Sequence, residues 1–205
     1  MTVYYFEGSP IVAPLTIESN EPIFSADTVN LKQQRVSQGA QRWELSFQIQ
    51  TKDNEEELLV GMVTGVSASK SMVMPQLNSV NTKTKATNDA TVFTTTSIVG
   101  STSLFVNFAQ AGALLLPKGS FIKFSGHSKI YMITEDVTTH LNLNRNVKFY
   151  PSLTNAVVAG EIMYHAGSVI KPTIQYYRDL ETLQGIIYDD GVLVNPGTIR
   201  LLEAL

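Results

Sequence analysis

The sequence contains no cysteine in its 205 residues. This absence excludes disulfide bonds, thiolate metal ligands and a cysteine nucleophile, although it does not identify a compartment. Charged residues are also scarce, at 16% against an average of about 25% for soluble proteins. Much of the surface must therefore consist of Ser, Thr, Asn and Gln, which is usual for extracellular β proteins and for subunits of large particles.

Basic residues do not dominate, since the net charge is −3. Phosphate binding needs clustered Lys and Arg, so we expect no specific nucleic-acid binding. A continuous apolar run of the length that crosses a membrane is also missing, and we expect no membrane contact. Residues 1–14 lack a basic region followed by an apolar run, so no signal peptide is predicted.

Short apolar runs separated by Gly, Pro, Asn and Asp recur along the chain and predict a β-rich fold. The clearest run is RWELSFQIQ at 42–50, where apolar and polar residues alternate as in a half-buried strand. Its apolar face consists of Trp43, Leu45, Phe47 and Ile49. Further strands are predicted at 101–108, 119–124, 129–134, 146–153 and 160–167. Three or four short strands follow Pro172, with an Asp-Gly hairpin turn at 188–192.

One helix is predicted, at about residues 54–65. Asp53 can cap it, and Glu56 three residues later completes a capping box. Leu58, Leu59, Met62 and Val63 share one face at helical spacing.

The composition changes at Ser79, because 14 of the 25 residues from Ser79 to Ser103 are Ser, Thr or Asn. We interpret this stretch as a linker followed by the first strands of a second unit. The prediction is a mainly β protein with two domains. Residues 1–78 and 171–205 form a discontinuous β-sandwich-type domain with one helix. Residues 79–170 form an inserted OB-like small β-barrel.

Residues with catalytic or metal-binding chemistry do not cluster in the sequence. His127, His140 and His165 lack the spacing of a zinc site, and we interpret them as two loop residues and a strand end. Glu135-Asp136 and Asp189-Asp190 are adjacent pairs, whose side chains point to opposite faces of a strand. We interpret them as solvated turn residues, although carboxylates distant in sequence can meet in a fold. We therefore predict no catalytic residue, no metal ligand and no cofactor.

The order of several segments resembles the distal tail protein (Dit-like) family of long-tailed bacteriophages. The segments are QQRVSQGAQRWELSFQIQ at 33–50, the capped helix, MVMPQL at 72–77, PKGSFIKFSGHSKIYMITEDV at 117–137, VKFYPSLTNAVVAGEIMY at 147–164 and TIRLLEAL at 198–205. The resemblance extends from about Gln33 to Leu205, and its most specific part runs from Lys118 to Tyr164.

The resemblance implies a structural virion protein at the distal end of the tail, assembled in the host cytoplasm. Family members form a hexameric ring that joins the tail tube to the tail tip or baseplate and leaves a channel for DNA. Their discontinuous N-terminal domain builds the ring, and in some relatives an inserted barrel decorates its outside. The implied partners are other copies of the chain, the tail tube protein, a tail-tip hub or baseplate protein, and fibre or collar proteins.

Apolar residues near the N-terminus, which we expect to be exposed, are the candidates for the contact between subunits, or for an ordinary edge strand. They are Tyr4, Tyr5, Phe6, Ile11 and Val12. An alternative function is a glycan-binding tail or baseplate module, with Phe105, Phe108 and Tyr150 as sugar contacts. Another baseplate ring protein is a further alternative, and a glycan hydrolase is the third hypothesis. Because catalytic clusters are missing, we predict that the protein is not an enzyme.

Overall fold

The computed structural model describes residues 3–27, 33–37, 40–49, 58, 60, 68–92, 96–108, 114–138, 144–179, 188–189, 192–193 and 197–205. The predicted helix at about 54–65 lies outside the described residues except for Leu58 and Val60. Both of these are helical; Leu58 is buried and Val60 is exposed.

The chain divides into two compact units. The barrel unit comprises Met1–Tyr4 and Ser71–Gln175, and the sheet unit comprises Tyr5–Lys70 and Tyr176–Leu205. The inserted segment therefore begins at residue 71, where the sequence had suggested 79, and ends at 175, where it had suggested 170. The segment Met1–Tyr4 belongs with the barrel unit, whereas we had expected it in the sheet unit.

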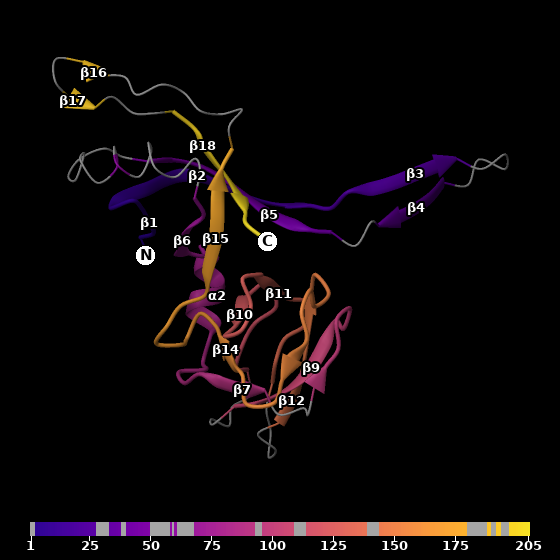
Figure 1. Ribbon diagram of the computed structural model, residues 1–205. Coiled ribbons are helices and arrows are strands. Elements are labelled where there is room, and N and C mark those ends of the chain that lie inside the picture. The colour runs from indigo at the N-terminus through magenta and orange to yellow at the C-terminus, as the bar shows by residue number, and fades with distance from the viewer. Residues whose placement is uncertain are drawn as a thin grey trace. The chain divides into compact units, whose positions relative to one another are not determined.

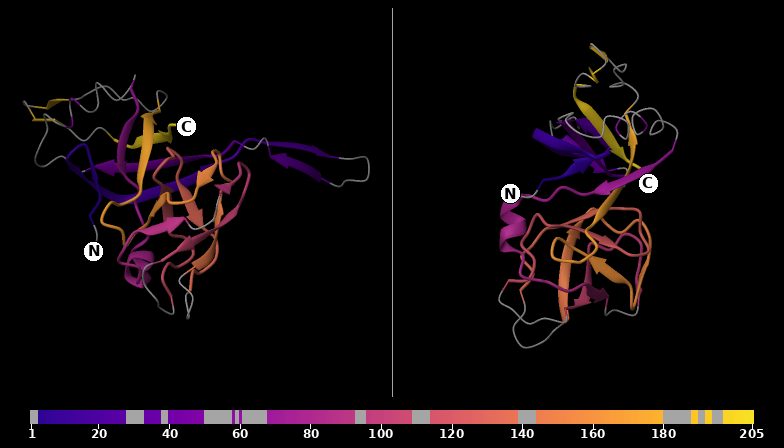
Figure 2. Two further views of the ribbon diagram at one scale, coloured as in Figure 1. Left: turned by 60° about the horizontal axis from the view of Figure 1, so that its bottom comes forward. Right: turned by 90° about the vertical axis from the view of Figure 1, so that its left-hand side faces the viewer.

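Within its described residues, the barrel unit contains one helix and eight complete strands. They are α2 (Asn78–Lys83), β7 (Ala90–Val92), β8 (Thr96–Ser97), β9 (Ser103–Asn107), β10 (Phe121–Phe124), β11 (Tyr131–Ile133), β12 (Asn144–Tyr150), β13 (Val157–Val158) and β14 (Ile162–Tyr164). Six of them close into an antiparallel barrel in the order β10-β11-β12-β9-β7-β14 (Figure 1). Two further views in Figure 2 show these magenta-to-orange strands wrapped around the barrel interior. The barrel has one strand more than the five of an OB fold.

The barrel core is built from the side chains that point inward at every second position of its strands. Ile122 and Phe124 of β10 and Tyr131 and Ile133 of β11 are all fully buried in one apolar cluster, as the sequence predicted. The Phe124 ring lies 5.5 Å from that of Tyr131, and the Tyr131 ring lies 5.4 Å from that of Phe149 on β12. These tilted and edge-to-face contacts add to the stabilisation from apolar burial.

Helix α2 lies in the stretch that we had interpreted as a linker, so that interpretation is wrong for Asn78–Lys83. Its buried residue is Val80 alone, which leaves no apolar periodicity to detect. Contacts distant in sequence hold the residues before it. The Gln76 side-chain amide pairs with the backbone of Phe121, with both bonds at 2.9–3.0 Å. The Tyr4 hydroxyl accepts hydrogen bonds from the Gln76 backbone N–H at 2.8 Å and from Asn81 at 3.2 Å.

The strands that belong wholly or partly to the sheet unit are β1 (Tyr5–Phe6), β2 (Ser9–Asn20), β3 (Ile23–Asp27), β4 (Gln33–Ser37), β5 (Arg42–Ile49), β6 (Lys70–Val73), β15 (Thr173–Arg178), β16 (Tyr188–Asp189), β17 (Val192–Leu193) and β18 (Ile199–Glu203). Six form one sheet in the order β1-β2-β5-β18-β15-β6. Strands β6 and β15 carry the chain from one unit to the other. The C-terminal strand β18 lies between β5 and β15, so the end of the chain completes this sheet.

Strand β5 has the predicted buried face, since Trp43, Leu45, Phe47 and Ile49 are all at most 4% exposed. Phe6 packs against Phe47 with ring centroids 5.4 Å apart. The pairing of Tyr188 with Leu193 and of Asp189 with Val192 agrees with the predicted hairpin, whose turn lies outside the described residues. The prediction of a mainly β protein with a β-sandwich-type unit and a small barrel is confirmed.

Candidate functional sites

A two-stranded arm extends from the sheet unit. Strands β3 and β4 pair from Ile23↔Ser37 to Asp27↔Gln33 and form a separate sheet of their own. Figure 1 shows this ribbon continuing from β2 and β5 and extending past the end of the sheet. Ile23 is 51% and Phe24 63% exposed. A two-stranded ribbon is marginally stable by itself in water, so such an arm gains stability when it finds a packing partner.

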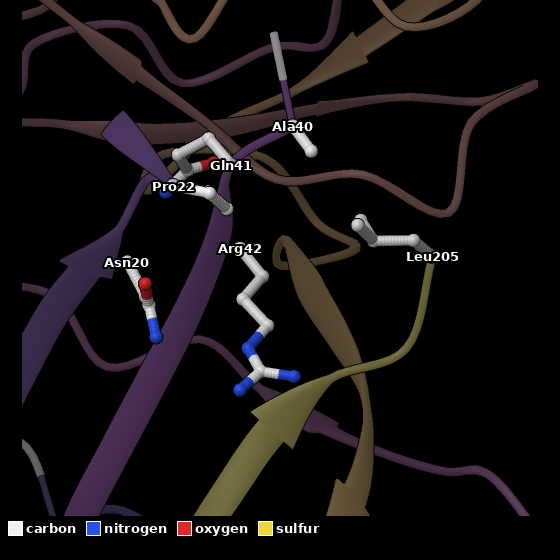
Figure 3. Close-up of a pocket in the computed structure, with 6 residues that line it drawn as sticks. All are labelled: Asn20, Pro22, Ala40, Gln41, Arg42 and Leu205. Carbon is white, nitrogen blue, oxygen red and sulfur yellow. The ribbon is translucent and has the colours of Figure 1, made fainter. Parts of the chain in front are cut away.

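A pocket of about 390 Å³ lies at the base of the arm. Its lining residues are Asn20, Pro22, Ala40, Gln41, Arg42 and Leu205. Figure 3 shows Leu205 on one side, Asn20, Pro22 and Gln41 on the other, and Ala40 and Arg42 between them. The pocket is large enough for a small ligand, yet it lacks the convergent polar groups that usually orient one.

A buried carboxylate, Glu44, lies beside a second hollow on the same sheet. This hollow is lined by Glu18, Glu44, Leu45, Ser46 and Arg200. Glu44 Oε1 accepts hydrogen bonds from Asn20 at 2.7 Å and from Arg42 Nε at 3.0 Å. Arg200 of β18 donates to the other oxygen of Glu44 at 2.5 Å and approaches Asp179 to 3.4 Å. Glu44 alternates with the apolar residues of the predicted half-buried strand, yet it is only 3% exposed.

The surroundings of Glu44 fit a structural role. Burial raises the pKa of its carboxyl, but hydrogen bonds from Asn20, Arg200 and Arg42 outweigh burial and hold the pKa below its ordinary value. A general acid needs a raised pKa, and a base needs an oxygen free to take a proton. Glu44 has a lowered pKa, and both of its oxygens already accept hydrogen bonds; it joins β2, β5 and β18 through charge-assisted hydrogen bonds.

The five candidate interface residues have different environments. Phe6 is 1% exposed and packs against Phe47 and Tyr176, so our prediction that it is exposed is wrong. The Tyr4 hydroxyl is engaged near α2, and Ile11 is half-buried. Tyr5 and Val12 remain accessible, at 58% and 39% exposure. Alternation along β1 explains why Tyr5 is exposed and Phe6 is buried, because neighbouring residues on a strand face opposite ways.

The three candidate sugar contacts also differ in how exposed their side chains are. Phe108 is 2% exposed within the barrel core and cannot stack on a sugar, so that prediction is wrong. Phe105 is 47% exposed on the outside of β9, and Tyr150 is half-buried at the end of β12. Phe105 and Phe108 are three residues apart, so alternation along β9 already places them on opposite faces.

His127 lies in the loop between β10 and β11, as we had interpreted it, but it is buried. It is 5% exposed, and its ring Nδ1 lies 2.9 Å from the Tyr131 hydroxyl. Its ring also packs edge-on against Phe124. Burial lowers the pKa of His127, while a backbone bond to Ala156 and the charge of Glu161 oppose this shift. The turn therefore folds inward over the barrel core.

His165 is fully buried at the end of β14. The backbone N–H of Gly167 donates to its Nδ1 at 3.0 Å, so the proton of the neutral ring is on Nε2. That nitrogen donates to the Asn88 carbonyl at 2.9 Å. These bonds tie the segment after β14 to the segment before β7. His140 lies outside the described residues.

Within the described residues, the adjacent carboxylates Glu135 and Asp136 stabilise the local structure by binding nearby groups. Glu135 forms an ion pair with Lys148 at 2.8 Å, and Asp136 accepts a hydrogen bond from the backbone N–H of Lys118 at 2.8 Å. The Asp189 side chain and Asp190 lie outside the described residues. Within the described ranges, no three His, Cys, Asp or Glu residues come together as a metal site. None of the helical segments that the structure describes has the length and apolar character needed to cross a membrane.

Comparison with protein-family models and with curated proteins returned no match to this chain.

Proposed function

We propose that this protein is a structural subunit of a larger assembly. The particular role that we propose is a hexameric ring adaptor at the distal end of a phage tail, which joins the tube to the tail tip or baseplate and leaves a channel for DNA. The order of sequence segments described above supports the phage-tail assignment. The discontinuous sheet unit, completed by β18, has the layout that the resemblance implies.

The observation that carries the proposal is the arm of β3 and β4. It exposes Ile23 and Phe24 on a ribbon whose described strands pair only with each other. A ring needs a head-to-tail contact, in which a projection of one subunit meets a different surface of the next. An arm that exposes Ile23 and Phe24 provides the projection, and the pocket at its base provides a concave, mainly apolar surface.

The test is the assembly state of the purified full chain, alone and mixed with the tail tube and hub proteins. Light scattering and negative-stain imaging should show six-fold rings, with a mass of about 135 kDa for six copies of 22.5 kDa. Phe24→Ser should weaken assembly, because it removes an exposed aromatic anchor of the kind that dominates interfaces. Val169→Ser is the matched control, because Val169 is 88% exposed but lies in the barrel unit.

A chain that stays monomeric at every concentration, and forms no ring with either partner, would contradict the proposal. If Phe24→Ser forms rings as well as the wild type does, the protein assembles into rings but the arm does not drive that assembly.

A further inference from the structure

The outward face of β9 and β12 carries side chains that the barrel core does not use. The inward-pointing residues of the two strands are at most 2% exposed; they are Leu104 and Val106 of β9 and Val147 and Phe149 of β12. The alternate residues therefore point outward. Their register places Ser103 opposite Lys148, Phe105 opposite Asn146 and Asn107 opposite Asn144.

Phe105 occupies the centre of this face. It is 47% exposed although it lies in the middle of a paired strand. Asn146 is its cross-strand neighbour, and Asn107 lies two residues along the same strand. Asn107 Nδ2 donates to Asn144 Oδ1 at 2.7 Å, which fixes the orientation of both amides. That bond uses one donor and one acceptor, so each amide has a further group with which to bond a ligand.

The charge of the face is balanced. Among the outward residues of β9 and β12, Lys148 is the cation, and it is paired with Glu135 at 2.8 Å. Arg145 is nearer to Phe105 in the strand register, but it alternates with the outward residues and donates to the backbone carbonyls of Thr138 and Asn144. A single-stranded nucleic acid would require a positively charged groove beside the aromatic ring. An uncharged polyhydroxylated ligand requires an aromatic surface with amides on its flanks, and that combination is what the face offers.

The dimensions also fit a sugar. Cross-strand neighbours lie about 5 Å apart, and alternate residues along a strand lie about 7 Å apart. One sugar ring placed over Phe105 would bring its hydroxyl groups over the flanking amides. The C–H groups on one face of a sugar carry partial positive charge, which the negative face of an aromatic ring attracts.

We propose that the outward face of β9 and β12 binds a neutral glycan. Phe105 stacks against one sugar ring, and Asn107, Asn144 and Asn146 bond its hydroxyl groups. The site belongs to the barrel unit alone and does not depend on ring assembly. It keeps Phe105 of the sugar contacts that the sequence suggested and replaces Phe108 with the amides.

The test is a nuclear magnetic resonance titration of the ¹⁵N-labelled full chain. The probes are four neutral hexasaccharides, built from α-linked glucose, β-linked glucose, mannose and N-acetylglucosamine, with (dT)₁₂ as the nucleic-acid competitor. At least one hexasaccharide should shift the amide signals of 103–107 and 144–148 saturably. Phe105→Ala should weaken this binding about tenfold. Phe105→Trp should preserve it, because the aromatic face remains.

Val158→Ala is the control, since Val158 is 49% exposed on β13 of the same unit. It should leave the affinity unchanged. The proposal is overturned if no hexasaccharide shifts these signals at about 10 mM, a concentration that fills even a very weak site. It is also overturned if Phe105→Leu binds as well as Phe105→Trp, or if (dT)₁₂ alone shifts this face.

Discussion

Single residues at the closing point of the barrel determine how closely the chain segments before β7 and after β14 approach each other. Gly167 lies so near Ala86 that a side chain there would meet the Ala86 carbonyl oxygen at 1.7 Å. His165 binds both segments through its two ring nitrogens. Small changes here therefore act on the whole barrel, because the contacts are between backbone groups that cannot turn away.

Gly167→Ala should lower the free energy of unfolding by about 3 kcal/mol or more, because overpacking against backbone forces the two segments apart. Gly126→Ala is the matched control. Its added carbon would meet the carboxylate of Glu161 at 3.3 Å, and that flexible side chain can move. Urea unfolding of both variants measures the difference. Equal stability of the two variants would show that the approach of Gly167 to Ala86 is not close.

His165 should make the barrel sensitive to acid. Burial lowers its pKa, the charge of Lys171 lowers it further, and the Asn88 carbonyl and Asp89 oppose these effects. The unfolded chain therefore binds a proton at a higher pH than the folded chain does. Stability is fully present above the unfolded pKa of about 6.5 and is lost as the pH falls toward the folded pKa.

Urea midpoints measured between pH 8 and pH 5 test this prediction. The wild type should lose stability over that range, and His165→Gln should lose less. The variant keeps a dependence from His127, whose pKa is also lowered by burial. An equal loss in the wild type and in His165→Gln would exclude His165 as a source.

At the scale of elements, alternation predicted strands well where one face is apolar, as in β5, β10 and β11. It failed for Glu44, because the partner that buries this residue, Arg200, is 156 positions away in the sequence. It also failed for α2, which buries Val80 alone and whose Asn81 donates to the hydroxyl of the distant Tyr4. Periodicity reports which face is apolar, but it does not report which polar residues will find each other.

The Glu44 contacts should contribute measurably to the pairing of β2, β5 and β18. Glu44→Gln keeps the shape of the side chain but removes the charge that Arg42 and Arg200 approach. We expect a loss of about 1–3 kcal/mol, at the scale of hydrogen bonds to charged groups, because both arginines are partly exposed and water replaces some of the interaction. Glu135→Gln is the control, since its ion pair with Lys148 is exposed on both sides. Urea unfolding measures the free energy of unfolding of both variants. An equal loss in the two would show that the burial of Glu44 does not strengthen its contacts.

At the scale of the whole molecule, two units share one chain that crosses between them at β6 and β15. Each unit has its own apolar core: the barrel cluster in one, and Phe6, Phe47 and Tyr176 in the other. The composition change near Ser79 indicated an insertion, but the border itself lies within strands β6 and β15. A strand that belongs to both units has no loop signal at the border, so composition could not locate it.

Because the barrel has its own core, a fragment of residues 71–175 should fold by itself. Its amide spectrum should match that of the same residues in the full chain. It should nevertheless be less stable than the barrel within the full chain by about 1–2 kcal/mol, because it lacks Tyr4, whose hydroxyl bonds Gln76 and Asn81.

Tyr4→Phe in the full chain should reproduce most of that loss, measured as a decrease in the hydrogen-exchange protection of the barrel amides. Tyr5→Phe is the control, because Tyr5 is 58% exposed and belongs to the sheet unit. An unfolded fragment would show instead that the barrel depends on the sheet unit, and that the two cores form one cooperative structure.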